Sequence, residues 1–216
     1  MNICCIYSQE AFTTVDKPLS SPAQIPFGIS YITTIFKERD YDVGLMVLTP
    51  NSNIDKMIRN YIKEKKPSLF CLTAVSSQFP FICSVAKQIK LIDPSIYVVL
   101  GGHHATLNPE HAIRSQYIDC ICVGEGELAI IELASKLKNG ERIREINNLW
   151  IKDKSTNEIE KNKTNSFIED LDSLPMIDRN IWKPWIEDNN RMHSVLVGRG
   201  CPNRCTYCSN HHSCPK

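Results

Sequence analysis

Three cysteines near the end of the chain are spaced so that their thiolates could hold one inorganic centre. Cys201, Cys205 and Cys208 form a CxxxCxxC pattern within the stretch GRGCPNRCTYC. Each cysteine side chain reaches only a short way from its backbone, so thiolates this close together in one loop can converge on a single metal ion or cluster. The neighbouring Pro, Asn and Ser residues form no apolar core that would need these thiols.

The number of ligands separates two metal-binding interpretations of this loop. Structural zinc takes four protein ligands, and a fourth is at hand in Cys214, His211 or His212. An iron–sulfur cube held by three cysteines instead leaves one iron open to a substrate or cofactor. The CxxxCxxC spacing is less usual than CxxC pairs for zinc but is compatible with it. Spacing alone therefore leaves both interpretations open.

The other six cysteines have a different setting, inside or beside apolar segments. We expect them to be small buried hydrophobic residues in a reducing compartment rather than disulfide partners. They are Cys4, Cys5, Cys71, Cys83, Cys120 and Cys122.

The size and charge of the chain are those of an ordinary soluble globular protein. Its 216 residues allow one core of about 150 residues and an appendage. With 42% hydrophobic residues and a net charge of +1, the composition gives no reason to expect nucleic acid or an anionic membrane as a partner. The start MNICCIYSQE lacks the features of a signal peptide, and no apolar run approaches the roughly 20 residues that span a bilayer. We expect a cytoplasmic protein.

Apolar and amphipathic segments alternate over residues 1–140. Nearly continuous apolar runs of strand length indicate parallel strands covered on both faces, and the segments between them have helical spacing. The expected strands are 2–7, 43–48, 68–74, 96–102 and 119–124, and the expected helices are 28–39, 53–65, 80–92, 108–116 and 127–138. Because parallel neighbours need right-handed crossovers, the pattern predicts a doubly wound α/β domain, flavodoxin-like or Rossmann-like, with a five-stranded sheet in the order 2-1-3-4-5.

The last of these helices has a recognisable packing face and end. Asn139 and Gly140 mark where it stops. Its apolar stripe consists of Leu128, Ile131, Leu133 and Leu137.

The pattern changes after the fifth helix. The segments INNLWIKDK and NEIEKNK predict a small polar hairpin that turns near residues 155–157. Residues 166–190 contain two prolines and two tryptophans without a sustained period, so we interpret them as a linker that packs. RMHSVLVGRG predicts one more strand, ending at Gly198 just before the cysteine loop. The expected divisions of the chain are 1–140, 141–190 and 191–216.

The loops after the strands are the candidate ligand-binding positions, because open α/β sheets bind ligands at the carboxyl ends of their strands. Gly101, Gly102, Gly124 and Gly126 lie in two of these loops. Glycines let the backbone approach a bulky ligand closely, and they leave the backbone N–H donors unencumbered. Small residues in several of the loops after the strands therefore indicate a broad, flat ligand. The alternative is that these glycines only form tight turns.

Nucleotide-binding motifs fit the chain poorly. GEGELA (124–129) formally matches the GxGxx[GA] dinucleotide motif, but it follows the fifth expected strand rather than the first. Glu125 and Glu127 would also put negative charge beside a pyrophosphate. No GxxxxGK[ST] occurs, and the first strand ends in Ser8 and Gln9 where a phosphate-accepting receiver domain has acidic residues.

Two adjacent histidines follow the glycine pair of the fourth loop. Neither His103 nor His104 has a sequence partner that would fix its tautomer, and loop histidines are more often solvated than ligands. We expect both to line the wall of a pocket rather than to bind a metal directly.

The cysteine loop and the chain before it resemble a known family. GRGCPNRCTYC is similar to the cluster motif of the radical S-adenosylmethionine enzymes, in which an aromatic residue, here Tyr207, precedes the third cysteine. The preceding residues resemble the cobalamin-binding N-terminal domain of one large class of these enzymes. The stretches that carry this likeness are PFGISYITTIFKERDYDV (26–43), LTAVSSQF (72–79), VVLGGHHATLNPE (98–110), VGEGE (123–127) and LDSLPMIDR (171–179).

The resemblance implies three cofactors. Cys201, Cys205 and Cys208 would ligate a [4Fe-4S] cluster whose open iron chelates the amino and carboxyl groups of S-adenosylmethionine, and one electron would cleave that molecule to a 5′-deoxyadenosyl radical. Tyr207 would contribute near the adenine. The corrin ring of cobalamin would lie over the strand ends. The residues flanking it would be Ser76, Ser77 and Gln78, Gly101, Gly102 and His103, and Gly124, Glu125 and Gly126.

Two departures from the family pattern bear on function. No DxHxxG motif occurs, so the histidine that ligates cobalt in other cobalamin proteins is absent, and the resemblance does not make His103 its replacement. A radical enzyme of this class also needs a partial (β/α) barrel of roughly 200 residues, whereas eight residues follow Cys208. We therefore expect the N-terminal portion of a cobalamin-dependent radical enzyme, truncated or shortened, without activity in isolation.

The alternative is a binding module: an α/β domain that carries cobalamin or another flat ligand, with the terminal cysteines idle or holding zinc. As partners we expect small-molecule cofactors and the remainder of a barrel, but neither nucleic acid nor a membrane. Trp182 and Trp185 would pack against that barrel, and their exposure in this chain would favour self-association through the linker.

Overall fold

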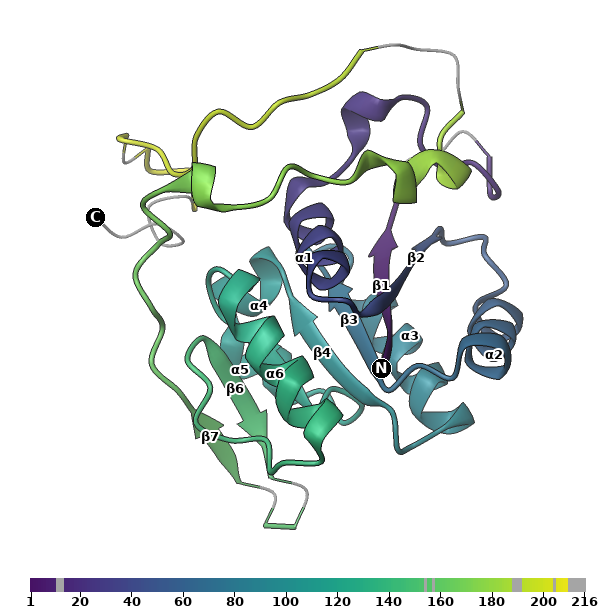
Figure 1. Ribbon diagram of the computed structural model, residues 1–216, viewed down its shortest axis with the longest axis vertical. Coiled ribbons are helices and arrows are strands. Elements are labelled where there is room, and N and C mark those ends of the chain that lie inside the picture. Colours follow the sequence, from purple (N-terminus) through teal and green to yellow (C-terminus); the bar gives the residue numbers. More distant parts are fainter. Residues whose placement is uncertain (11–13, 154, 157, 188–191, 204, 210–216) are drawn as a thin grey trace.

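A mostly parallel sheet forms the centre of the structure (Figure 1). The computed structural model describes residues 1–10, 14–153, 155–156, 158–187, 192–203 and 205–209. Over these residues the strands are β1 (Asn2–Ser8), β2 (Asp42–Leu48), β3 (Leu69–Thr73), β4 (Tyr97–Gly101), β5 (Cys120–Cys122), β6 (Leu149–Lys152) and β7 (Ile159–Lys161). Their order across the sheet is β2-β1-β3-β4-β5-β6-β7, so the expected order of the first five strands is confirmed.

The strands are apolar on both faces because both faces of the sheet are covered by helices. In β1, Ile3 and Cys5 belong to one core and Cys4 and Ile6 to the other, and all four are fully buried. The helices are α1 (Phe27–Glu38), α2 (Ile54–Lys65), α3 (Phe79–Ile92), α4 (His103–Leu107), α5 (Pro109–Ile113) and α6 (Glu127–Asn139). Helices α1 and α6 cover one face, and α2 to α5 cover the other (Figure 1). The doubly wound α/β architecture is thus confirmed.

The expected helix 108–116 is wrong in its extent. Two short helices, α4 and α5, take its place, and the first begins directly after β4. The break falls at Asn108, whose φ of −131° and ψ of 56° lie outside the helical region. Pro109 explains the break, because its ring disfavours the helical conformation for the residue before it.

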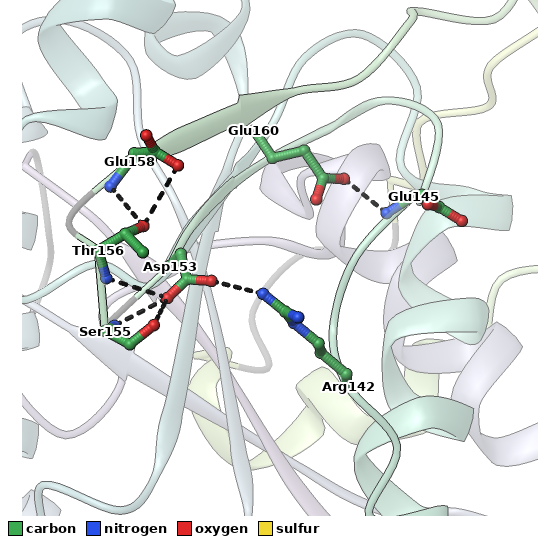
Figure 2. Close-up of polar contacts among 7 residues, drawn as sticks. All are labelled: Arg142, Glu145, Asp153, Ser155, Thr156, Glu158 and Glu160. Atoms are coloured by element: carbon green, nitrogen blue, oxygen red, sulfur yellow. Dashed lines mark hydrogen bonds and ion pairs between the residues drawn. The ribbon is translucent and has the colours of Figure 1, made fainter.

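The hairpin β6–β7 is confirmed, and it also extends the sheet. Strand β6 pairs antiparallel with β5, with Cys122 opposite Leu149, so the sheet gains two strands beyond the five expected. Leu149 and Ile151 are both buried, and this alternation gives β6 a face that packs on the core. Asp153 accepts a hydrogen bond from the backbone N–H of Ser155 at the turn and pairs with Arg142 (Figure 2).

The segment after the hairpin packs on the α/β core. It contains the short 3₁₀ helices Leu171–Ser173 and Arg179–Trp185; a third, Pro22–Gln24, precedes α1. The expectation of exposed tryptophans is wrong for Trp182, which is fully buried with its ring edge-on to Tyr7 at 5.9 Å. Trp185 is half-buried. Because the core of this chain buries the Trp182 indole, that side chain is not available for self-association.

The expected strand ending at Gly198 is also wrong. Residues 192–200 contain no strand, and none of the described strands pairs with them. Val195 and Val197 are 74% and 95% exposed, respectively. An apolar alternating segment forms a strand only where another strand can take up its hydrogen bonds.

In the described part of the chain, no helix is both long and apolar enough to cross a membrane.

Candidate functional site

A cavity of about 460 Å³ lies at the carboxyl ends of β3, β4 and β5. The beginning of α1 and the beginning of α6 form its sides, and residues 198–200, from the segment that leads to the cysteine loop, contribute to its lining. This is the end of the sheet at which doubly wound folds bind their ligands. The volume is within the range of small-molecule pockets.

Six of the expected cofactor-contacting residues line this cavity. They are Gly101, Gly102, His103, Gly124, Glu125 and Gly126. Gly102 has a φ of +90°, and a Cβ placed on it would lie 2.6 Å from Thr73 Oγ1 and 2.9 Å from the carbonyl oxygen of Ala74. Only glycine can bring the backbone this close to β3 while leaving the cavity open.

The walls of the cavity are mainly apolar. Helix α1 contributes Ile29 and Ile32, and α6 contributes Ile130. Cys122 lies on the wall as well, and burial, with the nearby charge of Glu127, raises the pKa of its thiol to about 12. Because that thiol stays protonated at neutral pH, Cys122 acts here as a small apolar residue and not as a thiolate ligand.

Thr106 is a cavity residue that the sequence analysis missed. Its Oγ1 accepts a hydrogen bond from the Gly124 N–H at 3.1 Å, which ties the loop after β4 to the loop after β5. The spacing from His103 to Thr106 is the signal that could have found it. Residues three apart lie on the same face of a helix, and His103 already lines the cavity.

The two adjacent histidines have different roles. His103 is exposed and lines the cavity, as expected, but His104 is buried and lies away from it. Nδ1 of His104 is 3.0 Å from Ser76 Oγ, and its ring stacks on Phe79 with centroids 4.0 Å apart. The expectation that His104 lines the pocket is therefore wrong, because partners distant in sequence hold its ring in the opposite layer.

The loop after β3 supports the site from outside the cavity. Ser76, Ser77 and Gln78 do not line it. Gln78 Nε2 donates to the carbonyl of Ser8 at 3.0 Å, which joins the ends of β1 and β3. Ser77 Oγ is 3.4 Å from a carboxylate oxygen of Glu10. This loop thus connects neighbouring strand ends, while the glycine loops after β4 and β5 contribute to the cavity lining.

The acidic residues of the GEGE loop are paired with an arginine near the cysteine loop. Nη1 of Arg199 lies 2.5 Å from Glu125 Oε1, and Nη2 lies 2.6 Å from Glu127 Oε1. The other oxygen of Glu125 accepts the backbone N–H of Ile168 at 2.7 Å. Both carboxylates thus share the single positive charge of Arg199.

The cysteine loop begins where the cavity lining ends. Cys201 and Cys205 are exposed, Cys208 is half-buried, and the Cys208 N–H donates to the carbonyl of Cys205 at 3.0 Å in a turn. Tyr207 is 91% exposed. Within the described ranges, no three His, Cys, Asp or Glu side chains are grouped to hold a metal ion. Cys214, His211 and His212, the alternative fourth ligands, lie outside the described residues.

The fold agrees with a comparison against known families. Residues 22–134, just over half of the chain, match the B12 binding domain. The chain belongs to the B12-binding domain family. Its seven-stranded, Rossmann-like sheet over the described residues, with the cavity at the strand ends, is the structural form of that family here.

Curated relatives extend this likeness along most of the chain. An uncharacterized methyltransferase of Pyrococcus horikoshii is 28% identical over 188 residues, covering 86% of this chain and 40% of the relative. The anaerobic magnesium-protoporphyrin IX monomethyl ester cyclase of Rubrivivax gelatinosus is 27% identical over 195 residues, covering 85% and 34%. The chain thus spans less than half the length of these relatives.

Solved structures of cobalamin-dependent radical enzymes share the fold. The cobalamin-dependent S-adenosylmethionine radical enzyme OxsB, with aqua-cobalamin and S-adenosylmethionine bound, has a TM-score of 0.65 at 17% identity, covering 85% of this chain and 25% of that one. The radical methyltransferase TsrM of Kitasatospora setae, with cobalamin and a [4Fe-4S] cluster bound, has a TM-score of 0.59 at 18% identity, covering 71% and 29%. This chain therefore contains a B12-binding domain that resembles that of the cobalamin-dependent radical S-adenosylmethionine enzymes.

Proposed function

We propose that the chain binds cobalamin at the cavity formed by the carboxyl ends of β3, β4 and β5, as the cofactor-binding part of a radical S-adenosylmethionine enzyme. The observation that supports this most directly is the backbone at Gly101 and Gly102 after β4, here called the glycine cradle. The conformation of Gly102 brings the backbone so close to Thr73 that no side chain fits there, and this keeps the cavity open between the two glycine loops.

The residues of the cavity fit part of such a cofactor. Apolar walls from α1 and α6 suit the hydrocarbon surfaces of a corrinoid, and the glycine backbone of the β4 and β5 loops allows close contact. Cobalamin is larger than a cavity of about 460 Å³. We therefore propose that part of it enters the cavity and the remainder lies over the strand ends.

The two histidines after β4 have different proposed roles at the site. Of the two histidines, His103 lines the cavity. Both ring nitrogens of His104 are engaged, with Ser76 and with His111. We propose that His103 contributes to the wall of the site and that His104 fixes the loop behind it.

We further propose that Cys201, Cys205 and Cys208 hold a [4Fe-4S] cluster, with Tyr207 near the adenine of S-adenosylmethionine. Three thiols fit a cluster with one open iron, and Gly200, which precedes Cys201, lines the cavity, so the loop starts beside the proposed cobalamin site. When bound, the cluster supplies the electron for reductive cleavage of S-adenosylmethionine. The protein's part is to present three thiolates from one loop.

Anaerobic reconstitution tests the cluster. The full chain should bind about four iron atoms and develop the broad visible absorption of thiolate-to-iron charge transfer. Cys205→Ser should lose most of both, whereas Cys83→Ser, a control at a half-buried cysteine on α3, should retain both. A colourless protein with one zinc per chain would instead support the alternative of a binding module with a structural metal.

Titration with hydroxocobalamin tests the cobalamin site. The unaltered chain should show quenching of tryptophan fluorescence and should stay red through gel filtration. Gly126→Leu should weaken binding, because Gly126 has an ordinary backbone conformation and its new side chain would project toward Cys122 and Ile32 on the cavity wall. Leu128→Gln, at an exposed position of the same helix, is the matched control. No retained colour in the unaltered chain would refute the proposal.

A further inference from the structure

The segment of residues 194–200, here called the strap, contributes to the lining of the cavity. It leads into the cysteine loop (Figure 1). Leu196 and Gly198 lie on the cavity wall, between two anchored ends. At the first end, Ser194 Oγ donates to the carbonyl of Ala23 at 2.9 Å, and Arg179 donates to the carbonyl of Ser194 at 2.6 Å. The strap is thus fixed to the core before it reaches the cavity.

Arg199 anchors the second end of the strap. Its guanidinium uses one nitrogen for Glu125 and the other for Glu127, at 2.5 and 2.6 Å. The same group lies over the ring of Tyr31 on α1, 5.1 Å from the ring centroid. Arginine suits this position because its planar fork can address two carboxylates and an aromatic face at once.

The burial of this cluster distinguishes it from an ordinary surface ion pair. The side chains of Arg199, Glu125 and Glu127 are 20%, 13% and 7% exposed, respectively. Carboxylates this far from water need a positive partner, and removing that partner leaves uncompensated charge. Loss of Arg199 should therefore cost more than loss of an exposed ion pair would.

We propose that Arg199 is a positioning residue that fixes the cysteine loop beside the cobalamin cavity by latching onto the two acidic residues of the GEGE loop. This inference rests on the proposed function. It also changes the role expected for Glu125, whose two oxygens are taken by Arg199 and by the backbone of Ile168 rather than left for a cofactor. Because Arg199 lies two residues before Cys201, the latch sets where the cluster loop begins.

The latch can be tested in the cofactor-free full chain by limited thermolysin digestion. Arg199→Gln should accelerate cleavage within residues 194–200 about tenfold or more, since it removes both ion pairs that hold the strap on the cavity wall. Arg199→Lys keeps the charge but loses the fork, and it should give an intermediate rate. The matched control is Arg142→Gln, which removes an exposed ion pair with Asp153 at the β6–β7 turn (Figure 2) and should leave this cleavage unchanged.

A double-mutant cycle tests whether the arginine acts through the acidic pair. If the groups act together, the strap in Arg199→Gln combined with Glu127→Gln should be cleaved no faster than in Arg199→Gln alone. From the cobalamin-loaded chain, Arg199→Gln should also release hydroxocobalamin about tenfold faster than Arg142→Gln, because the strap lines the cavity. Unchanged cleavage of the strap, or effects that simply add, would overturn the latch.

The two proposals fail separately. Cleavage of the strap is measured without any cofactor, so it judges the latch alone. Retention of hydroxocobalamin by the unaltered chain judges the proposed function alone. A latch that is present in a chain that binds no cobalamin would overturn the positioning role while leaving the ion pairs as structural.

Discussion

Nε2 of His104 and Nδ1 of His111 lie 3.1 Å apart, so a hydrogen bond joins the two rings across the start of α4 and α5. His104 is buried, and its other nitrogen meets Ser76 Oγ. A second proton on His104 would put a charge in an apolar layer and beside another imidazole. Burial, and then the neighbouring His111, accordingly lower the pKa of His104 below its ordinary value of 6.5.

This histidine pair predicts a loss of stability in mild acid. Because the folded-state pKa of His104 is below the unfolded value, the unfolded chain binds more protons near pH 6, and stability present above pH 6.5 is lost as the pH falls toward the folded value. Urea unfolding between pH 7.5 and about 5.5 measures it. His104→Gln should flatten this dependence, whereas His193→Gln, at an exposed position, should not. A slope that His104→Gln leaves intact would assign the effect elsewhere.

Gly102→Ala should destabilise the chain by about 1–3 kcal/mol. Its φ is +90°, and the added Cβ would press on Thr73 and on the backbone of Ala74, which cannot move away as a flexible side chain could. Gly28→Ala is the control for stability, because Gly28 is helical and a Cβ there meets no atom within 4 Å. Thermal unfolding compares the two, and equal losses would contradict the strain argument.

Lys90→Met should cost roughly 3–5 kcal/mol, a large part of the stability of a domain. Nζ of Lys90 lies 2.5 Å from Asp119 Oδ2 and donates to the carbonyl of Ile96, while the Val98 N–H donates to the same carboxylate at 2.8 Å. The substitution removes the ammonium group that contacts the buried carboxylate of Asp119, on which the charge of Lys152 also acts.

Lys87→Met, at an exposed position of the same helix, is the control for this pair and should stay within about 0.5 kcal/mol of the unaltered chain. Denaturant unfolding measures both variants. A Lys90→Met variant as stable as the Lys87→Met variant would show that the pair is dispensable.

Trp182→Ala should cost about 3–5 kcal/mol by leaving a large cavity next to Tyr7. Trp182→Phe should lose much less, because it keeps most of the apolar volume and removes an indole N–H that has no hydrogen-bond partner among the described residues. Calorimetry distinguishes the two. Similar losses in both variants would mean that the indole N–H contributes more than its surroundings indicate.

The parts of this structure that were predictable are those set by local pattern. The apolar runs gave the five parallel strands and their order, and Gly140 ends α6 in the left-handed conformation with a φ of 67°. The packing stripe of α6 was partly wrong. Leu128 is 68% exposed, whereas Glu127 is buried, because an arginine that pairs with Glu127 lies 72 positions further along the chain.

The remaining differences have the same physical origin. His104 is held by Ser76, 28 positions away, so nothing in its own loop revealed that it would turn from the cavity. Residues 192–200 have a strand-like pattern, but pairing depends on a neighbour that the pattern itself does not specify. Local sequence specified the glycine cradle well, and long-range pairing decided which charged and polar residues surround it.

The antiparallel hairpin has a consequence for solubility. A parallel sheet that stopped at β5 would leave a row of unsatisfied amide and carbonyl groups on a strand made of apolar residues, which is a template for fibril growth. Strand β6 caps that row, and the outermost strand β7 is only three residues long and carries Glu160 and Lys161. The molecule thus ends its sheet on a short, charged border that discourages another copy from adding to it.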